Sequence, residues 1–158
     1  MRDELIATDF EELFSPDDVD CVFEESQKGT ILLFINSVCG CAAGSARPGV
    51  NLSLQYQTIP DKLVTVFAGQ EKEAVEYIRQ KFLSDFMSSS PFVALFKNGQ
   101  LVHTIQRFEI EGTHPDEVAN RLEEVFDEYC SRKGPSISPE QFEKVKKYRK
   151  SGSTIPHF

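Results

Sequence analysis

Tryptophan is absent from the 158-residue sequence, yet 13 phenylalanines are present and 40% of the residues are hydrophobic. This composition predicts a packed globule rather than a disordered chain. A chain of this length can bury a full apolar core without cross-links. We therefore expect one domain, with room for a short appendage.

Long apolar runs and an excess of basic residues are also missing. No run is long enough to span a membrane, and residues 1–5 (MRDEL) lack the apolar stretch of a signal peptide. The net charge of −8 argues against a nucleic-acid partner, because phosphate binding requires a basic face. The expectation is a cytoplasmic protein with neither a membrane nor a nucleic acid as partner.

Cysteine is scarce, with four residues in the chain. In a reducing cytosol, four cysteines are not expected to form a structural disulfide framework. Three roles remain open for them: metal binding, catalysis, or packing as buried thiols that behave like small hydrophobic residues.

Two continuous apolar runs predict strands that are buried on both faces, as in a parallel arrangement. They cover residues 30–35 and 63–68, and residues 71–86 carry the apolar stripe of a helix. Asn98-Gly99 lies between two further apolar runs and is the strongest short signal for a β-hairpin. A last long helix is predicted to begin at Thr113.

Capping residues suggest where the other helices begin and end. Thr8 and Glu11 resemble a capping box and predict a first helix over the residues that follow. Ser15, with Pro16 after it, predicts the start of a second helix. Pro48-Gly49 should interrupt or kink the helix that follows the first strand.

The order of predicted elements is helix, strand, helix, strand, helix, hairpin, helix. Two buried strands joined by a crossover helix and followed by an antiparallel hairpin form a mixed sheet with helices on both faces. We therefore predict an α/β protein with a thioredoxin-like fold over residues 1–133. Gly134-Pro135 breaks the chain, and residues 134–158 form a short, basic, helical C-terminal extension of charge +3, which leaves −11 for the rest.

Cys39 and Cys41 stand between the C-terminal end of the first buried strand and the start of a helix, where functional crevices of α/β sheets lie. A helix N-terminus offers unpaired backbone N–H groups and the positive end of a dipole, which stabilise a thiolate and lower its pKa. Cys39, at or just before the first turn, is the predicted nucleophile. Cys41 is the predicted resolving thiol, and Gly40 is expected to supply the backbone freedom that the short spacing demands.

A disulfide between Cys39 and Cys41 would close a small ring and should be strained, and strained disulfides are easily reduced. The pair therefore indicates an exchange site rather than a structural cross-link. Inert packing thiols and two of four zinc ligands are the alternatives. A second close pair of zinc ligands is missing, because the other cysteines and the histidines are scattered: Cys21, Cys130, His103, His114 and His157.

Predictions also follow for four positions outside the Cys39–Cys41 pair. We expect Cys21 to be buried on the first helices and Cys130 to be a half-buried structural residue, with a third functional thiol as the alternative. Ser90-Pro91 precedes a strand that could lie beside the cysteine loop, the segment that carries Cys39 and Cys41. By analogy with thioredoxin-like folds, we expect the peptide bond before Pro91 to be cis and Pro91 to support the active site. The alternative is an ordinary proline at the start of a strand. Arg47 could bind a substrate carboxylate, or it could be a solvated surface side chain.

Several segments resemble the bacilliredoxin family, whose Cys-Gly-Cys string with its flanks is the most specific part. They are residues 36–50 (NSVCGCAAGSARPGV), 63–70 (LVTVFAGQ), 89–91 (SSP) and 126–130 (FDEYC). The resemblance extends from about Phe10 to Cys130. It implies a thioredoxin fold and an oxidoreductase that removes bacillithiol from mixed disulfides on cytosolic proteins, with Cys39 as nucleophile.

The implied chemistry needs no metal and no organic cofactor, since a small thiol, bacillithiol or a relative of it, is the co-substrate. The partners are then thiolated cytosolic proteins and that small thiol. Two alternatives stay open on the sequence. One is a general protein disulfide isomerase or reductase, and the other is a non-enzymatic redox-sensing module.

Overall fold

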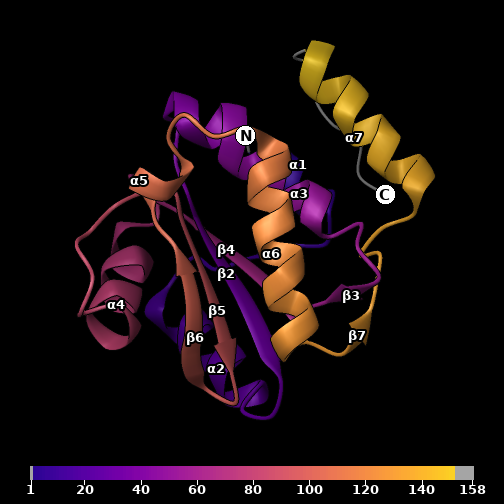
Figure 1. The fold of residues 1–158 in the computed structure, drawn as a ribbon. Coiled ribbons are helices and arrows are strands. Elements are labelled where there is room, and N and C mark those ends of the chain that lie inside the picture. The colour runs from indigo at the N-terminus through magenta and orange to yellow at the C-terminus, as the bar shows by residue number, and fades with distance from the viewer. Residues whose placement is uncertain (1, 152–158) are drawn as a thin grey trace.

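The computed structural model describes residues 2–151 and shows a five-stranded mixed sheet in the order β1-β4-β2-β5-β6 (Figure 1). This confirms the predicted α/β, thioredoxin-like arrangement. The strands are β1 (Glu11–Glu12), β2 (Thr30–Asn36), β4 (Lys62–Phe67), β5 (Phe92–Lys97) and β6 (Gln100–Ile105).

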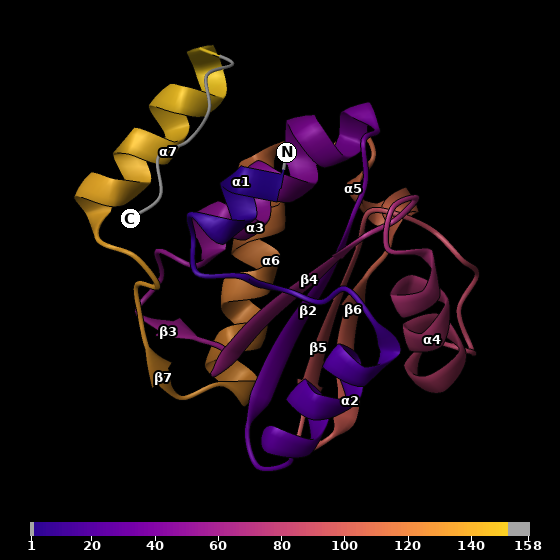
Figure 2. The same ribbon diagram turned by 180° about the vertical axis from the view of Figure 1, so that it is seen from behind.

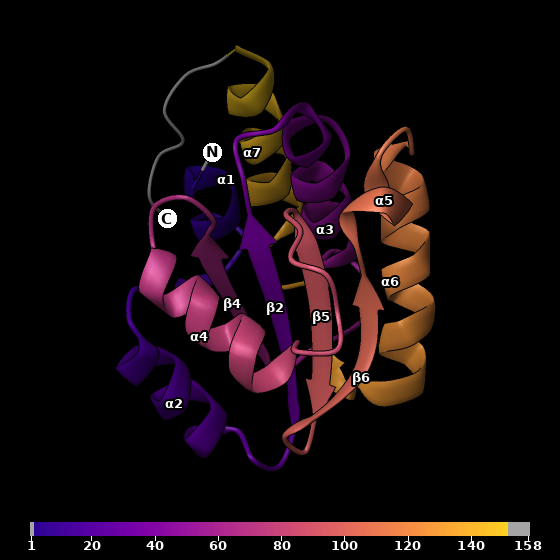
Figure 3. The ribbon, with the colours of Figure 1, turned by 90° about the vertical axis from the view of Figure 1, so that its left-hand side faces the viewer.

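Strand β2 lies at the centre of the sheet, and all seven of its residues are buried. It runs parallel to β4 and antiparallel to β5, and β5 is in turn antiparallel to β6. The C-terminal ends of β2 and β6 and the N-terminal end of β5 therefore meet at one edge of the sheet, which is the upper edge in Figure 3.

The predicted hairpin is confirmed. Asn98 and Gly99 connect β5 to β6 with φ angles of 53° and 80°. Positive φ at both central residues is what the tight turns of β-hairpins require, and asparagine and glycine adopt it more readily than other residues.

Helices cover both faces of the sheet. Leu13 and the apolar sides of α2 and α4 pack on one face, while α1, α3 and α6 pack on the other (Figures 1 and 2). The helices are α1 (Arg2–Ile6), α2 (Pro16–Glu25), α3 (Arg47–Ser53), α4 (Lys72–Phe82), α5 (Arg107–Ile110), α6 (Pro115–Tyr129) and α7 (Pro139–Ser151), with a π-helical turn, η1, at Ala42–Ala46.

The helix predicted after Thr8 is wrong. Helix α1 has already ended at Ile6, the Thr8 hydroxyl donates to the Leu5 carbonyl, and residues 11–12 form strand β1. Strand β1 pairs with the edge of β4, so backbone hydrogen bonds to a distant strand outweigh the local capping signal. The last long helix also differs slightly, since its N-cap is His114 rather than Thr113.

Pro48 does not break the helix that follows β2. Residues 40–53 stay helical, and the wider π turn η1 lies just before Pro48. A proline has no N–H and crowds the carbonyl four residues earlier, and a π turn is one of the local adjustments that relieve such a conflict. The chain therefore continues directly from the cysteine loop into α3.

Gly49 lies where α3 crosses α6, and we expect Gly49→Ala to destabilise the protein by about 1–3 kcal/mol. A Cβ at this position would lie 2.6 Å from Val118 Cβ and 2.9 Å from the Pro115 carbonyl oxygen. Urea unfolding followed by far-UV circular dichroism measures the change. Gly44→Ala is the matched control, because its Cβ would meet nothing within 4 Å. Equal stability of the two variants would contradict the close crossing.

The chain beyond α6 stays attached to the body. Strand β7 (Arg132–Lys133) pairs with β3 (Thr58–Ile59), and Gly134 N–H donates to the Gln57 carbonyl. The predicted boundary between residues 133 and 134 stays a prediction. Helix α7 follows, with Phe142 and Val145 buried, and residues 152–158 of the predicted extension lie outside the described residues. Within residues 2–151, no helix combines the length and hydropathy needed to cross a membrane.

Candidate active site

The structure brings the two predicted thiols together at the end of β2. Cys39 and Cys41 are free cysteines whose Sγ atoms lie 2.8 Å apart. The Cys39 carbonyl accepts hydrogen bonds from the N–H groups of Ala42 and Ala43, at 3.1 and 3.2 Å, which begin the helical segment. Cys39 therefore occupies the position just before the first turn that the sequence predicts.

Hydrogen bonds favour the thiolate form of Cys39. Burial acts to raise its pKa, but hydrogen bonds from the Cys41 thiol, the Ser37 hydroxyl and the Ala42 N–H outweigh burial, and the pKa of Cys39 is lowered. The Ser37 Oγ donates to Cys39 Sγ over 3.1 Å. Stabilised in this way, Cys39 is the more nucleophilic thiol at neutral pH.

Cys41 has the opposite bias. Burial, the hydrogen bond with Cys39 and the charge of a Cys39 thiolate together raise the pKa of Cys41, and the Glu111 carboxylate adds to the shift. A proton shared by the two sulfurs therefore stays on Cys41 while Cys39 carries the negative charge. An attacking and a resolving thiol require this asymmetry, and the assignment of those roles to Cys39 and Cys41 stays a prediction.

Gly40 is not held in a conformation that only glycine adopts. Its φ lies outside the left-handed region, and a Cβ placed on it would meet nothing within 4 Å. The expectation that the short spacing demands the freedom of glycine is therefore not met in the dithiol form. A larger side chain at this position would therefore meet no steric conflict within 4 Å.

Arg47 is neither solvated nor directed at the surface, so the expectation of an exposed side chain or a substrate ligand is corrected. It is 2% exposed, and its Nη1 donates to Asn36 Oδ1 at 2.9 Å and to the Ser37 carbonyl at 2.8 Å. Its Nε lies 3.7 Å from Glu4 Oε1 on α1. The guanidinium turns inward because the loop backbone and a buried carboxylate offer it partners there.

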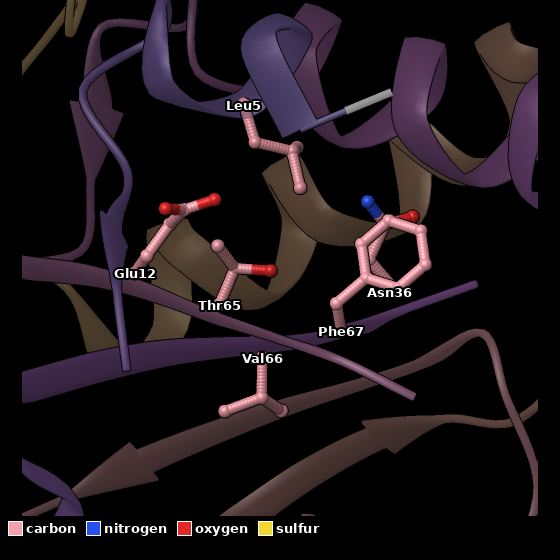
Figure 4. A pocket seen from close by; sticks show the side chains of 6 residues that line it. All are labelled: Leu5, Glu12, Asn36, Thr65, Val66 and Phe67. Atoms are coloured by element: carbon pink, nitrogen blue, oxygen red, sulfur yellow. The ribbon is translucent and has the colours of Figure 1, made fainter. Parts of the chain in front are cut away.

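Asn36 joins the loop to the sheet. Its side-chain oxygen also accepts from the Ser37 N–H at 2.9 Å, and its carbonyl accepts from the Ala68 N–H at 2.9 Å. A small hollow behind it is lined by side chains of α1, β1, β2 and β4 (Figure 4), namely Leu5, Glu12, Asn36, Thr65, Val66 and Phe67. Asn36 therefore connects these elements to the start of the cysteine loop through its hydrogen bonds to Ser37 and Arg47.

The predicted cis peptide bond between Ser90 and Pro91 is present. In the antiparallel pairing of β2 with β5, Ile35 lies opposite Phe92. Continuing this register by two residues places Ser90 and Pro91 beside the end of β2 and the start of the cysteine loop. The N-terminal end of β5 is therefore the second wall of the site.

Arg107 was not predicted from the sequence, although it belongs to the site. It begins α5, directly after β6, and its Nη1 donates to the Ser90 carbonyl at 3.3 Å. Its Nε donates to Glu111 Oε1 at 2.7 Å, and its charge acts to lower the pKa of both thiols, although the pKa of Cys41 stays raised overall. The available signal was the capping box of Gln106 and Glu109, which marks a helix start at the same sheet edge.

The other two cysteines lie away from this edge. The prediction that Cys21 is buried is wrong: it is exposed on the outer side of α2, and its thiol donates to Glu25 Oε1 at 3.4 Å, which raises its pKa. Cys130 is half-buried, as predicted, at the end of α6 near Thr30, and burial raises its pKa to about 11. Thr30 begins β2, so Cys130 is at the opposite end of the sheet from Cys39.

Because Cys21 and Cys130 are remote and carry raised pKa values, replacing both by alanine should leave turnover within about threefold of the parent. Initial rates of disulfide exchange measure this, and circular dichroism checks the fold. A large loss of activity in a folded double variant would reveal a relay of three or more thiols.

His103 is the partly buried histidine of β6. Burial lowers its pKa, which favours the neutral imidazole and agrees with the structural role that its place in the hairpin suggests. Across the described part of the chain, no group of three or more histidine, cysteine or acidic side chains is placed to hold a metal ion.

Comparison with known proteins gives one family and one fold. The sequence profile of a family described as "Disulphide isomerase" matches residues 1–130. A protein of Salinibacter ruber named "Bacilliredoxin" is 49% identical over 135 residues, covering 85% of this chain and 78% of the relative. A bacilliredoxin of Halalkalibacterium halodurans is 51% identical over 130 residues, covering 82% and 89%.

The similar solved structures are more distant in sequence. Thioredoxin of Schistosoma mansoni is 17% identical with a TM-score of 0.53, covering 77% of this chain and 96% of the thioredoxin. A redox protein from Chlamydomonas reinhardtii is 18% identical with a TM-score of 0.54, covering 85% and 40%. These structures share the fold, and helix α7 lies beyond the segment that the family profile matches.

Proposed function

Because the chain belongs to the bacilliredoxin family and is a thiol–disulfide oxidoreductase, we propose that it removes bacillithiol, or a similar small thiol, from mixed disulfides on cytosolic proteins. The observation that carries the proposal is the pair of free thiols at the end of β2, whose Sγ atoms lie 2.8 Å apart and whose environments differ. The pKa of Cys39 is lowered and that of Cys41 is raised, so one thiol is ready to attack while the other keeps its proton.

In the first step, the Cys39 thiolate attacks the sulfur of the small thiol in the mixed disulfide. The bond between that sulfur and the client cysteine breaks, and the client thiolate leaves with the electron pair and takes up a proton. A new disulfide joins Cys39 to the small thiol. The client is reduced by this exchange, and no electron comes from any other source.

In the second step, the small thiol is released from Cys39. Cys41, 2.8 Å from Cys39 Sγ, loses its proton and attacks that sulfur, which releases the small thiol and forms a disulfide between the two cysteines. Alternatively, a second molecule of the small thiol attacks the first, giving a small-molecule disulfide and a free Cys39. Two further equivalents of thiol are needed to reduce the internal disulfide in the first case.

The surface beside the thiols suits a protein client. Val38, next to Cys39, is 67% exposed, and Phe108, next to Arg107, is 71% exposed. Large apolar side chains left in water beside a reactive group can be covered by a partner during an encounter. No metal or organic cofactor enters either step.

A general protein disulfide isomerase or reductase is the second candidate, and the description of the matching family favours it. Its substrate would be a disulfide between two protein cysteines instead of one with a small thiol. The Cys39–Cys41 pair could serve both reactions. Membership in an enzyme family argues against a purely non-enzymatic redox sensor.

One experiment separates the two candidates. A single-cysteine client is prepared as its mixed disulfide with bacillithiol, glutathione or cysteine, and its release is timed by mass spectrometry; a protein with scrambled disulfides is tested in parallel. The proposal expects bacillithiol to be removed fastest and the scrambled protein to be repaired slowly. Similar slow rates on all three mixed disulfides, with fast repair of the scrambled protein, would favour the isomerase.

A further inference from the structure

We propose that Arg107 forms an anion-binding subsite beside the cysteine pair, where it holds a carboxylate of the small thiol that Cys39 removes from the client. This inference rests on the proposed function, because it names the class of small thiol that the site accepts: one that carries a carboxylate.

The sheet places Arg107 across the site from the cysteines. Strand β5 lies between β2, which leads into Cys39, and β6, which leads into Arg107. Two strand spacings separate the ends of β2 and β6, roughly 10 Å between backbones. The Arg107 guanidinium extends back over this gap, because its Nη1 bonds the carbonyl of Ser90 at the start of β5.

The charge of Arg107 acts on both sulfurs. Its charge acts to lower the pKa of both thiols, although burial and Cys39 keep the pKa of Cys41 raised overall. The pKa of Arg107 is raised first by its hydrogen bond to Glu111 and then by the charges of the two thiols. The hydrogen bond to Ser90, which lies beside the end of β2 in the sheet register, also places the guanidinium near the cysteine pair. A negative group attached to either sulfur therefore comes within its reach. A small thiol bonded to Cys39 extends from that sulfur by a few atoms, which brings its own charged groups into the same field.

Arg107 also has N–H groups available to donate to a ligand. A guanidinium has five N–H donors, and the bonds to Ser90 and Glu111 use two of them. The pair with Glu111 is exposed to solvent, at 44% for Arg107 and 53% for Glu111. Exposed ion pairs are weak, so a second carboxylate can bind beside Glu111 or replace it.

The ligand class follows from the chemistry of the guanidinium. Its planar fork matches a carboxylate and can bond it through two parallel N–H groups. A neutral small thiol gains nothing at this position, and a cationic one is repelled. The charge of the small thiol should therefore govern how fast it is removed.

Three small thiols of similar size test the idea on one client: 3-mercaptopropionate is anionic, 2-mercaptoethanol is neutral and cysteamine is cationic. The readout is the ratio of kcat/KM for the anionic to the neutral mixed disulfide, compared between variant and parent. Arg107→Ala should lower this ratio by about 10-fold, the typical effect of losing a charged hydrogen bond. Arg107→Glu should go further and favour cysteamine.

The ratio separates binding from a change in the thiol. Losing Arg107 also raises the pKa of Cys39, but that change slows all three substrates together and leaves the ratio unmoved. Arg121→Ala is the matched control, because Arg121 is an arginine on α6 that is 51% exposed and paired with Glu109 at 3.7 Å. We expect it to leave the ratio unchanged.

Three outcomes would count against the inference. Equal losses on all three substrates in Arg107→Ala would show that Arg107 acts on the thiolate alone. A parent enzyme that removes all three small thiols equally fast would show that charge is not recognised, while small-thiol removal itself would stand. A parent that removes no small thiol, bacillithiol included, would overturn the proposed function and this inference with it.

Discussion

Replacing Cys39 with serine should reduce small-thiol removal to the rate of the uncatalysed exchange, because the hydroxyl of serine is not ionised in this environment and cannot form the mixed disulfide. Cys41→Ser should retain the first step and accumulate the protein with the small thiol attached to Cys39. Intact-mass spectrometry detects that adduct directly. Adducts on Cys41 in the Cys39→Ser variant, with none in Cys41→Ser, would reverse the two roles.

The pKa shifts of the cysteines predict how the reactivity of each thiol depends on pH. The reactive form of Cys39 is the thiolate, and its lowered pKa means that the thiolate persists as the pH falls below the range of an ordinary cysteine. Alkylation of Cys39 should therefore level off at a lower pH than alkylation of Cys130, whose pKa is about 11. Rates of iodoacetamide labelling, followed by peptide mapping between pH 5 and pH 10, measure both curves.

Arg47→Met should destabilise the protein by about 3–5 kcal/mol, the usual effect of removing one partner from a buried ion pair. The guanidinium is 2% exposed and bonds Asn36 and Ser37, and its loss leaves Glu4 facing an apolar side chain. Urea unfolding followed by far-UV circular dichroism measures the change, since the chain has no tryptophan to report by fluorescence.

Two further variants make the Arg47 result interpretable. Arg47→Lys keeps the charge but not the fork geometry, and it should fall between the parent and Arg47→Met. Arg121→Met removes an exposed arginine and should change stability by less than about 1 kcal/mol. If Arg47→Met were as stable as Arg121→Met, the buried guanidinium would have no part in holding the cysteine loop.

The elements that could be predicted are those whose signals are local. Strand β2 is a continuous apolar run, and the hairpin depends on the positive φ angles that Asn98 and Gly99 tolerate. The position of Cys39 follows from its place between such a strand and a helix start. Each of these features depends on interactions within a few residues of chain, so the local sequence pattern is sufficient to predict it.

The features that could not be predicted depend on distant partners. Thr8 and Glu11 carry a capping signal, but β4, more than fifty residues later, draws residues 11–12 into the sheet. Arginine is a residue type usually found at the surface. Arg47 finds buried partners only because α1 and β2 pack against α3 in the folded protein. Residue type predicts that Cys21 is buried, whereas the buried side of α2 is formed by Val19, Val22 and Phe23.

Arg107 is an intermediate case. The rule that identified Cys39, a polar or reactive residue where a strand ends and a helix starts, applies equally to the end of β6. The antiparallel hairpin brings that end back to the same edge as the end of β2. The same rule, applied to the end of β6, identifies Arg107 as a residue beside the cysteines.

Glu4 on helix α1 pairs with Arg47, Arg47 bonds the Ser37 carbonyl, and the Ser37 hydroxyl bonds Cys39 Sγ. The reactivity of Cys39 should therefore depend on α1, although this helix supplies no atom to the exchange reaction. Helix α1 has five residues, and a helix this short is marginal unless packing holds it in place. Mild urea should open it before the body of the protein unfolds, since proteins open locally at lower free-energy cost than they unfold globally. Arg47 would then lose its carboxylate, and the loop that it clamps would loosen. The alkylation rate of Cys39 should therefore rise at urea concentrations that open α1 and leave the sheet folded.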